Sequence, residues 1–410
     1  RNQEFTLGTA PSDYTFGGVL GTQEINTRAS LYRPGTRITV SGANNSNYNW
    51  RTMATYASGL TEDGWAFVVS GGRRWAVESY NYEGVDYSSN ALFASVEKKF
   101  GDKHSLNFTS IYSQNQRGKN SPNTQEVNDL KGFQYNSYWG WQDGQKRNSR
   151  VKTVEEPILM LNHYWKVSNL TNLNTSLTYQ TGSVGNSRMD YNGGNNPDPT
   201  YYKNLPSYFL NMHYIPEDPF IVPTPTPDDA QAAIAKQNFL NDGQIDWARM
   251  YHANSVNKKS IYALYEDRVD DDLITFTSVL DSQIAENILM NASISYKNLK
   301  SENYQLMLDL LGDYTFLDTD TFYIGYGFTP SQSQSDLRNP NRQVGVGDKY
   351  GYNYVLRAET LDAFTQFKFT FSKVDFYLAQ SFTKTQYQRE GLYQNGLYSE
   401  NSYGKGQKLD

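Results

Sequence analysis

The sequence predicts an all-β protein whose strands form a transmembrane antiparallel β-barrel with long extracellular loops, and three observations support that fold class. Apolar and polar residues alternate over many segments of strand length, most clearly over residues 361–382. The chain is polar overall, with 38% hydrophobic residues and a mean hydropathy of −0.71, yet it carries 33 Tyr and 20 Phe. Only a narrow outer band of a membrane barrel has to be apolar, and aromatic side chains gather at its rims. Short turns also alternate with long loops, as they do at the two ends of such a barrel.

Residues 361–382 have the pattern of two strands joined by the tight turn Ser372-Lys373. Side chains alternate between the faces of a strand, so each strand here has one apolar and one mostly polar face. The apolar face carries Phe367, Phe369, Phe371, Val374, Phe376 and Leu378, and the opposite face carries Lys368, Thr370 and Asp375. We expect lipid against the first face and the lumen of a barrel against the second.

The composition also fits a soluble, aromatic-rich sandwich or propeller, and composition alone favours that class because soluble proteins are commoner. No apolar run approaches the ~20 residues of a spanning helix. The absence of Cys excludes disulfides, thiolate metal sites and cysteine nucleophiles. The formal net charge is −6, from 37 basic and 43 acidic residues, and no basic cluster is visible along the chain, so we expect no nucleic-acid partner.

Residues 1–33 are rich in Gly, Ser and Thr and do not alternate. They read as a turn, a short strand and a connector that are too small to fold alone. Pro34-Gly35 is a turn signal, and we expect the first wall strand near Arg37. Because the chain begins at Arg1 without Met or a signal peptide, we expect that its start was removed or that it is a segment of a longer protein.

Eleven strands are expected in the wall, which we assign to residues 37–385. Short turns rich in Gly, Asn, Asp and Ser separate many of them and are typical of hairpins. The turns lie at 61–64, 101–103, 168–170, 285–286 and 372–373, and the better defined strands are 37–43, 51–59, 65–73, 90–100, 104–113, 158–167, 171–181 and 259–282. Eleven strands that end at an open edge do not close a sheet, so we expect a segment of a larger barrel.

Long connections alternate with these turns and are predicted to be extracellular: 114–157, 182–258, 301–357 and the tail 386–410. A short helix is expected at 228–240, because acidic residues stand at its start. The run Val269-Asp270-Asp271-Asp272 resembles a turn, but two strands there would reverse the order of short and long connections. We therefore expect one strand over 259–282, with a bulge at the aspartates.

Several short stretches, in this order, are similar to TonB-dependent outer-membrane receptors of the Bacteroidetes type. They are Gly17-Gly18-Val19, Ile25-Asn26-Thr27-Arg28-Ala29-Ser30, Trp65-Ala66-Phe67, Ser95-Val96-Glu97-Lys98-Lys99, His104-Ser105-Leu106-Asn107-Phe108-Thr109, Tyr138-Trp139-Gly140, Lys146-Arg147-Asn148-Ser149-Arg150, Leu161-Asn162-His163-Tyr164-Trp165 and Glu266-Asp267-Arg268. The first two resemble the exit from the plug domain into the barrel. The resemblance implies half of a roughly 22-stranded plugged barrel, with residues 1–36 as the end of the plug and a connector.

The resemblance also implies a function and partners. Such receptors sit in the outer membrane of Gram-negative bacteria, contact its lipid and import a scarce ligand such as a sugar, peptide or chelate. Their energy comes from a TonB-type protein, which would act through a segment upstream of this chain. Some members are instead non-transporting subunits that scaffold a larger assembly with a surface lipoprotein or other outer-membrane subunits, and this alternative stays open. No enzymatic activity and no cofactor are implied.

The candidate ligand-binding residues form an aromatic and basic cluster in the loop 114–157. They are Tyr138, Trp139, Trp141, Lys146, Arg147 and Arg150, which suit a sugar, peptide or anionic ligand. The same residues also suit a structural role in which the aromatic rings pack the loop and the cations pair with acids or lipid phosphates, and the pattern favours this second role.

Metal and catalytic sites are not predicted. The four histidines are 104, 163, 213 and 252, and none stands at metal-ligand spacing from another. The aspartates 270–272 suit a hard cation, but a solvated acidic strand or turn is the commoner role of such a run.

Overall fold

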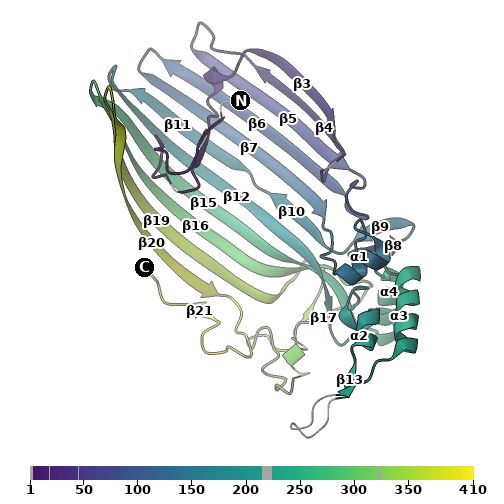
Figure 1. Ribbon diagram of the computed structural model, residues 1–410. Helices are drawn as coiled ribbons and strands as arrows, with labels where there is room; N and C mark the ends of the chain where they lie inside the picture. Colours follow the sequence, from purple (N-terminus) through teal and green to yellow (C-terminus); the bar gives the residue numbers. More distant parts are fainter. Residues whose placement is uncertain (1–2, 18, 45, 215–223, 321, 324–325) are drawn as a thin grey trace.

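A computed structural model describes residues 3–17, 19–44, 46–214, 224–320, 322–323 and 326–410 of the chain. Its main element is a 13-stranded antiparallel sheet that curves into a wall (Figure 1). The strand order is β21-β20-β19-β16-β15-β12-β10-β7-β6-β5-β4-β3. Strand β11 also lies between β7 and β12, in line with β10. The predicted all-β, antiparallel fold class is thus confirmed. Gly18 and part of the proline-rich stretch 219–227, within the predicted connection 182–258, lie outside the described residues.

The wall strands are long, and consecutive strands pair as neighbours. Their bounds are β3 (Gly35–Gly42), β4 (Trp50–Ala57), β5 (Trp65–Ala76), β6 (Tyr87–Phe100), β7 (His104–Gly118), β10 (Val151–Glu155), β11 (Ile158–Lys166), β12 (Thr171–Tyr191), β15 (Tyr262–Ala285), β16 (Ile288–Asp309), β19 (Lys349–Thr370), β20 (Asp375–Gly391) and β21 (Gly404–Lys405).

Strands β10 and β11 form a single crossing of the wall that is interrupted at Glu156 and Pro157. Both pair with β7 and with β12, and the register is the same on either side of the interruption. Pro157 has no N–H and cannot donate to the ladder, which explains the break. Counted in this way, the described wall has the eleven crossings that the sequence predicts, followed by the two-residue strand β21.

Strand β15 crosses the wall once, as predicted, but the bulge predicted at residues 270–272 is wrong. Each aspartate there pairs in regular register with β12 and β16, and the shifts in register lie at Leu264/Tyr265 and Gln283/Ala285 instead. The wall strands also extend beyond the predicted limits: β12 continues to Tyr191, β16 to Asp309 and β20 to Gly391, past the predicted boundary at 385. Polar residues and Gly dominate the ends of β12 and β20, and apolar residues stand on both faces at the end of β16 (Leu306 and Met307), so the alternation that marks a strand in the sequence is lost.

The two faces of the wall differ in polarity. Large apolar side chains on one face are exposed, including Phe67 at 39% and Phe276 at 42%. The opposite face carries Ser95, Glu97 and Asn107, all fully buried. This inward-polar, outward-apolar arrangement is the reverse of a soluble sandwich or propeller and matches a membrane barrel.

The predicted division of faces in residues 361–382 is confirmed. Lys368 forms an ion pair with Asp13, and Gln366 donates to the Ser12 carbonyl oxygen at 3.1 Å, so this face meets the N-terminal segment. Phe367, Phe369, Phe371 and Phe376 lie on the other face, where Phe369 stacks on Phe376 with ring centroids 4.6 Å apart, whereas Phe364 packs edge-on against Phe16 on the inner face.

The N-terminal segment lies against the inner face rather than in the wall. It forms a two-stranded sheet of β1 (Gln3–Thr6) and β2 (Thr22–Ile25), followed by the 3-10 helix η1 (Ala29–Leu31). Ala29 packs in a buried cluster with Ala57, Ala66 and Val68, and its N–H donates to Oδ1 of Asn107 at 3.0 Å. Figure 1 shows this segment near the end of the strands opposite the helices.

The long connections build a second, partly helical body at the other end of the wall (Figure 1). It contains α1 (Gln125–Lys131), α2 (Pro206–Leu210), α3 (Asp229–Asn241), α4 (Trp247–Asn257), the 3-10 helix η2 (Tyr202–Asn204), and the short pairs β8 (Trp139–Gln142) with β9 (Gln145–Asn148), β13 (His213–Tyr214) with β14 (Thr224–Pro225) and β17 (Phe316–Leu317) with β18 (Gln343–Val344). The predicted helix at 228–240 is α3, and the other helices were not predicted. Among the described residues, no helix is long and apolar enough to cross a bilayer.

Candidate functional site

The hairpin of β8 and β9 places all six predicted ligand-binding residues in one region of the loop body. Trp139 and Trp141 lie on β8, and Lys146 and Arg147 lie opposite on β9. Gly140 pairs with Arg147 and Trp141 pairs with Lys146, so the turn folds the basic residues back onto the aromatic ones. Two-stranded pairing of this kind explains why residues five to eight positions apart in the sequence touch.

Trp139 forms the buried centre of this hairpin. It is only 4% exposed, and its indole N–H has no hydrogen-bond partner among the described residues. Its ring fills the space beside Gly84, where a Cβ atom would lie 2.1 Å from the Trp139 ring. The Lys146 ammonium lies 4.5 Å from the ring centroid of Trp139, which favours a cation–π contact.

Lys146 also pairs with Glu78, with its Nζ 2.5 Å from Oε1. Burial raises the pKa of the Glu78 carboxyl, but hydrogen bonds from the Gly84 N–H and from Lys146 outweigh that effect and lower its pKa overall. The carboxylate therefore stays charged and holds the lysine against Trp139.

Arg147 connects the hairpin to a helix and to the wall. Its guanidinium lies 4.3 Å from the ring centroid of Trp247 on α4, and Nη2 is 2.6 Å from Oδ2 of Asp309 at the end of β16. Its Nη1 donates to Oε1 of Gln142 at 2.8 Å. The guanidinium N–H groups of Arg147 thus donate to partners within the chain.

Trp141 and Lys146 are the exposed members of the predicted set, and Arg150 is half-buried. The Arg150 guanidinium lies 5.2 Å from the ring centroid of Tyr138. Trp141 is 58% exposed and packs edge-on against Trp139. Trp139 is therefore buried in the loop body, Lys146 and Arg147 are already paired within the chain, and Trp141 keeps the most surface that a ligand can reach.

Two histidines that stand 59 positions apart in the sequence meet on the outer face of the wall. Nδ1 of His104 is 3.1 Å from Nε2 of His163, and His104 also stacks on Trp165. Only strand pairing reveals this contact, because β11 pairs with β7 in antiparallel register. No group of three or more potential metal ligands of the His, Cys, Asp or Glu type occurs among the described residues.

Two of the three aspartates in the predicted acidic run have contacts within the chain, whereas Oδ1 of Asp271 is buried without a hydrogen-bond partner among the described residues. Asp270 pairs with Nε of Arg268 at 2.8 Å and accepts from the Tyr304 hydroxyl at 2.6 Å. Asp272 accepts from the hydroxyls of Tyr179 and Thr181 at 3.0 and 2.8 Å.

A cavity of about 760 Å³ lies between the N-terminal segment and the inner face of the wall. Arg28 borders it and links the segment to the wall: Nη2 is 2.7 Å from Oε1 of the buried Glu97. The Arg28 guanidinium also lies 4.2 Å from the ring centroid of Tyr164.

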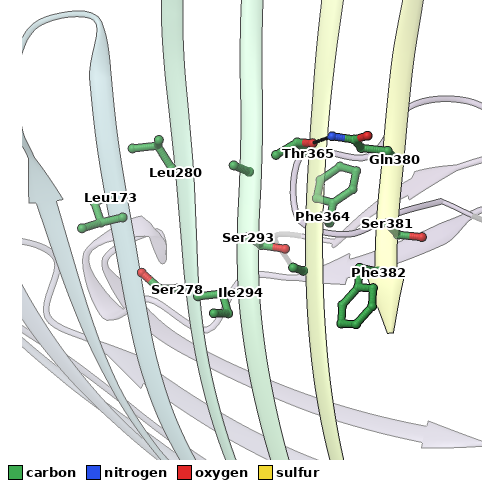
Figure 2. Close-up of a pocket in the computed structure, with 12 residues that line it drawn as sticks. Leu173, Ser278, Leu280, Ser293, Ile294, Phe364, Thr365, Gln380, Ser381 and Phe382 are labelled. Atoms are coloured by element: carbon green, nitrogen blue, oxygen red, sulfur yellow. Dashed lines mark hydrogen bonds between the residues drawn. The ribbon is translucent and has the colours of Figure 1, made fainter. Parts of the chain in front are cut away.

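A shallower groove of about 550 Å³ lies mainly on the outer face (Figure 2). Leu280 and Ile294 line one part of it and Phe382 another, while Gln380 donates to Thr365 at 3.1 Å. Small residues such as Ala292 and Ala363 leave the space between them. This lining suits a hydrocarbon chain better than a polar ligand.

The fold is similar to that of solved outer-membrane receptors. The ferric-catecholate import receptor Fiu from E. coli K12 matches with a TM-score of 0.51 in its open form and in its closed form, at 10% and 11% sequence identity. The two comparisons cover 91% and 98% of this chain but only 47% and 49% of the receptor. BauA, the ferric preacinetobactin receptor from Acinetobacter baumannii, matches with a TM-score of 0.50 at 9% identity, over 92% of this chain and 44% of that one.

The chain has the fold of about half a TonB-dependent receptor barrel. It spans about half the length of the solved receptors that it matches. At such low identity the likeness establishes the fold alone, and those structures are described as receptors, not enzymes. No family model and no curated protein matches the sequence.

Proposed function

We propose that this half-barrel is part of a TonB-dependent receptor of the Bacteroidetes type, which imports a scarce ligand through the outer membrane of a Gram-negative bacterium. Residues 1–36 are the end of its plug and a connector, and residues 37–385 are the first half of its barrel. The ligand class implied by the resemblance is a sugar, peptide or chelate.

The observation that carries this proposal is the position of the N-terminal segment on the polar face of a wall whose other face is apolar and exposed. A polar inner face has no stabilising partner in lipid, but it suits a water-filled or plugged lumen. Contacts of Arg28 with Glu97 and of Asp13 with Lys368 hold the segment to strands β6 and β19, which are far apart in the sheet. A segment that bridges distant strands across the inside of a curved wall supports the proposal that residues 1–36 are the end of a plug.

The ends of the strands support an orientation. Short turns join β4 to β5, β6 to β7, β11 to β12, β15 to β16 and β19 to β20, and the N-terminal segment contacts the wall near that end. In barrels of this type the short turns are periplasmic, so the energy-transducing protein would approach from this side. The loop body with α1–α4 then faces outward, where a ligand or partner first meets the protein.

One observation favours the alternative of a non-transporting subunit that scaffolds an outer-membrane assembly. The loop body has its own packed clusters, one around Trp247, Met250 and Leu264 and another around Tyr135 and Phe239. A preformed, ordered surface of this kind suits stable docking to a surface lipoprotein or another outer-membrane subunit.

Uptake by the full-length protein tests the proposal. Cells that lack their own copy would be complemented with the full reading frame, and accumulation of labelled sugars, peptides and metal chelates would be measured. We expect accumulation of one ligand class, lost when the TonB-type protein is deleted or a protonophore is added. Substitution of the six loop residues Tyr138, Trp139, Trp141, Lys146, Arg147 and Arg150 tests their role in ligand binding.

The alternative predicts a different outcome. A scaffold would copurify with stoichiometric partners, and its deletion would disturb their assembly without changing uptake of any ligand. Uptake that persists without the TonB-type protein would contradict the transport mechanism.

A further inference from the structure

Five cationic side chains gather where the wall meets the loop body. They come from the ends of β7 and β12 that are next to the loop body and from both sides of the start of β10. They are Arg117, Lys119, Arg150, Lys152 and Arg188. We call these five residues the lumen basic patch. These residues are spread over 72 positions of the sequence, so no run of basic residues predicts the patch.

The register of the strands places the patch on the inner face. Asn107 on β7 accepts a hydrogen bond from Ala29 of the N-terminal segment, so its side chain points inward. Arg117 lies ten residues further along the same strand, and the pairing of β7 with β6 has no shift between them. An even separation along an unbroken strand keeps side chains on one face.

The patch residues on the neighbouring strands also lie on the inner face. Lys152 is paired with Arg117 on one side and with Asn186 on the other. Directly paired residues point to the same face, and Arg188 follows Asn186 by two positions. Lys119 and Arg150 lie together next to these, since the Lys119 N–H donates to the Arg150 carbonyl oxygen at 2.7 Å.

The patch has fewer counter-charges than cations. Nε of Arg188 is 3.0 Å from Oδ2 of Asp267, the one ion pair of the patch within the described residues. Asp86 lies nearby, but its carboxylate accepts the N–H of Gly118. Lys119 donates to the Asn186 side chain, and the side chains of Arg117 and Lys152 have no hydrogen bond or ion pair among the described residues.

The pKa of Lys119 reflects the excess of positive charge in the patch. Burial lowers the pKa of its ammonium, and the positive charges of Lys152, Arg188, Arg150 and Arg117 lower it further. Like charges held together in this way repel one another unless an anion joins them. The whole chain carries a net charge of −6, so the patch is a local concentration of positive charge and not a consequence of composition.

We propose that the lumen basic patch binds a small polyanion, a ligand with two or more carboxylate, phosphate or sulfate groups. Paired residues on adjacent strands are about 5 Å apart, and alternate residues along one strand are about 7 Å apart. Anionic groups at similar spacing reach Arg117, Lys152 and Arg188 together, and guanidinium groups bind such oxygens in bidentate fashion. The proposal deepens the receptor function proposed above, because it gives the ligand a charge class and a place in the lumen.

Calorimetric titration of the detergent-purified full-length protein with tripolyphosphate and with citrate tests the proposal. We expect binding of at least one probe, weakened by added salt because charge attraction is screened. Arg117→Gln with Lys152→Gln should weaken binding by at least about tenfold, since both unpaired cations are lost. Arg117→Lys with Lys152→Arg keeps the charge and should retain most of the affinity.

A matched control removes the same charge elsewhere. Lys236→Gln with Arg249→Gln changes exposed residues on α3 and α4 and should leave binding unchanged. Failure of the wild type to bind either probe, unchanged binding by the Gln variant, or equal loss in the control would each overturn the proposal. Binding in detergent needs no energy coupling, so a protein that binds the probe but imports nothing would contradict the transport function and leave the patch intact.

Discussion

Glu97 shows how single side chains attach the N-terminal segment to the wall. Its carboxylate is fully buried and accepts hydrogen bonds from Nε of Arg28 at 2.8 Å, from the Ser105 hydroxyl at 2.6 Å and from the Ser30 N–H at 3.0 Å. Two of these donors belong to the segment and one to the wall. A buried carboxylate with this set of partners is stable only while the segment stays docked.

The first prediction concerns Arg28→Ala. It leaves the Glu97 carboxylate buried with its cation removed, and we expect a loss of about 3 kcal/mol in the free energy of unfolding. Urea titration of the refolded protein in lipid vesicles measures this, and limited proteolysis reports release of the segment. Lys236→Ala, which removes an exposed cation from α3 in the loop body, is the control and should change stability little. Equal stability of the Arg28 variant and the wild type would show that the contact is dispensable.

The second prediction concerns Gly140→Ala in the β8–β9 hairpin. A Cβ atom there would lie 1.8 Å from the carbonyl oxygen of Ile245, which is backbone and cannot rotate away. We expect the hairpin to separate from the segment before α4, with greater protease sensitivity of the loop body and altered fluorescence from the buried Trp139. Gly144→Ala, where nothing lies within 4 Å of the new atom, is the matched control and should cost only the strain of its positive φ, about 1 kcal/mol.

Among the elements, β11 has one apolar, exposed face and one polar face toward the N-terminal segment, as the proposed lipid and lumen sides require. Leu161 is 48% exposed and is paired with Phe108 on β7 and Leu177 on β12, so the apolar band continues across three strands. Asn162, the next residue, borders the inner cavity. Aromatic residues bound this band, with Trp165 toward the short turns and Tyr179 toward the loops, as in the aromatic girdles of membrane barrels.

The third prediction follows from the depth of Leu161 between those aromatic residues. Leu161→Arg should lower the free energy of unfolding in lipid vesicles by about 2–4 kcal/mol, because it places a charge near the middle of the bilayer. Phe369→Arg, close to the short turn, should cost less, about 0–1 kcal/mol. Ser176→Arg, on the inner face of β12, is the control. A larger cost for Ser176→Arg than for Leu161→Arg would place lipid on the wrong side of the wall.

For the whole molecule, the asymmetry between the two ends of the wall gives the topology. The connections 43–49, 77–86, 119–150, 192–261 and 310–348 lie at one end, and the turns around Thr61, Gly101, Ser168, Glu286 and Lys373 lie at the other. This is the predicted alternation, and Figure 1 shows the helices gathered at the first end. Short reversals suit the periplasmic side, and long loops suit the outside.

The fourth prediction is a protease test of that topology on intact cells. Cleavage is expected in the proline-rich stretch 219–227, part of which lies outside the described residues, while the turn at Gly101-Asp102 stays protected. Lysed cells provide the control, because both sites are then accessible. The reverse pattern, or cleavage at Asp270 from the periplasmic side only, would contradict the proposed orientation.

Much of the wall was predictable because alternation is a local property of the chain. The split between Phe369 and Lys368, the single crossing of β15 and the helix α3 all follow from patterns within one segment. The bulge at residues 270–272 was wrong because three aspartates resemble a turn in sequence, whereas neighbouring strands and the hydroxyls of Tyr179 and Tyr304 accommodate them. The strand ends next to the loop body were missed because apolar and polar residues do not alternate there.

The sequence by itself determined that this protein is an antiparallel wall with one apolar face. Both the alternation of apolar and polar residues and the order of turns and loops depend only on residues that are close together in the sequence. Only the tertiary structure decided which distant residues meet. The cations of the predicted site already have partners in Glu78, Asp309 and Trp247, the pair of His104 and His163 depends on strand register, and the lumen basic patch forms from residues on three strands. The physical reason is that side-chain proximity across a sheet is set by hydrogen-bond register between strands, which no single segment encodes.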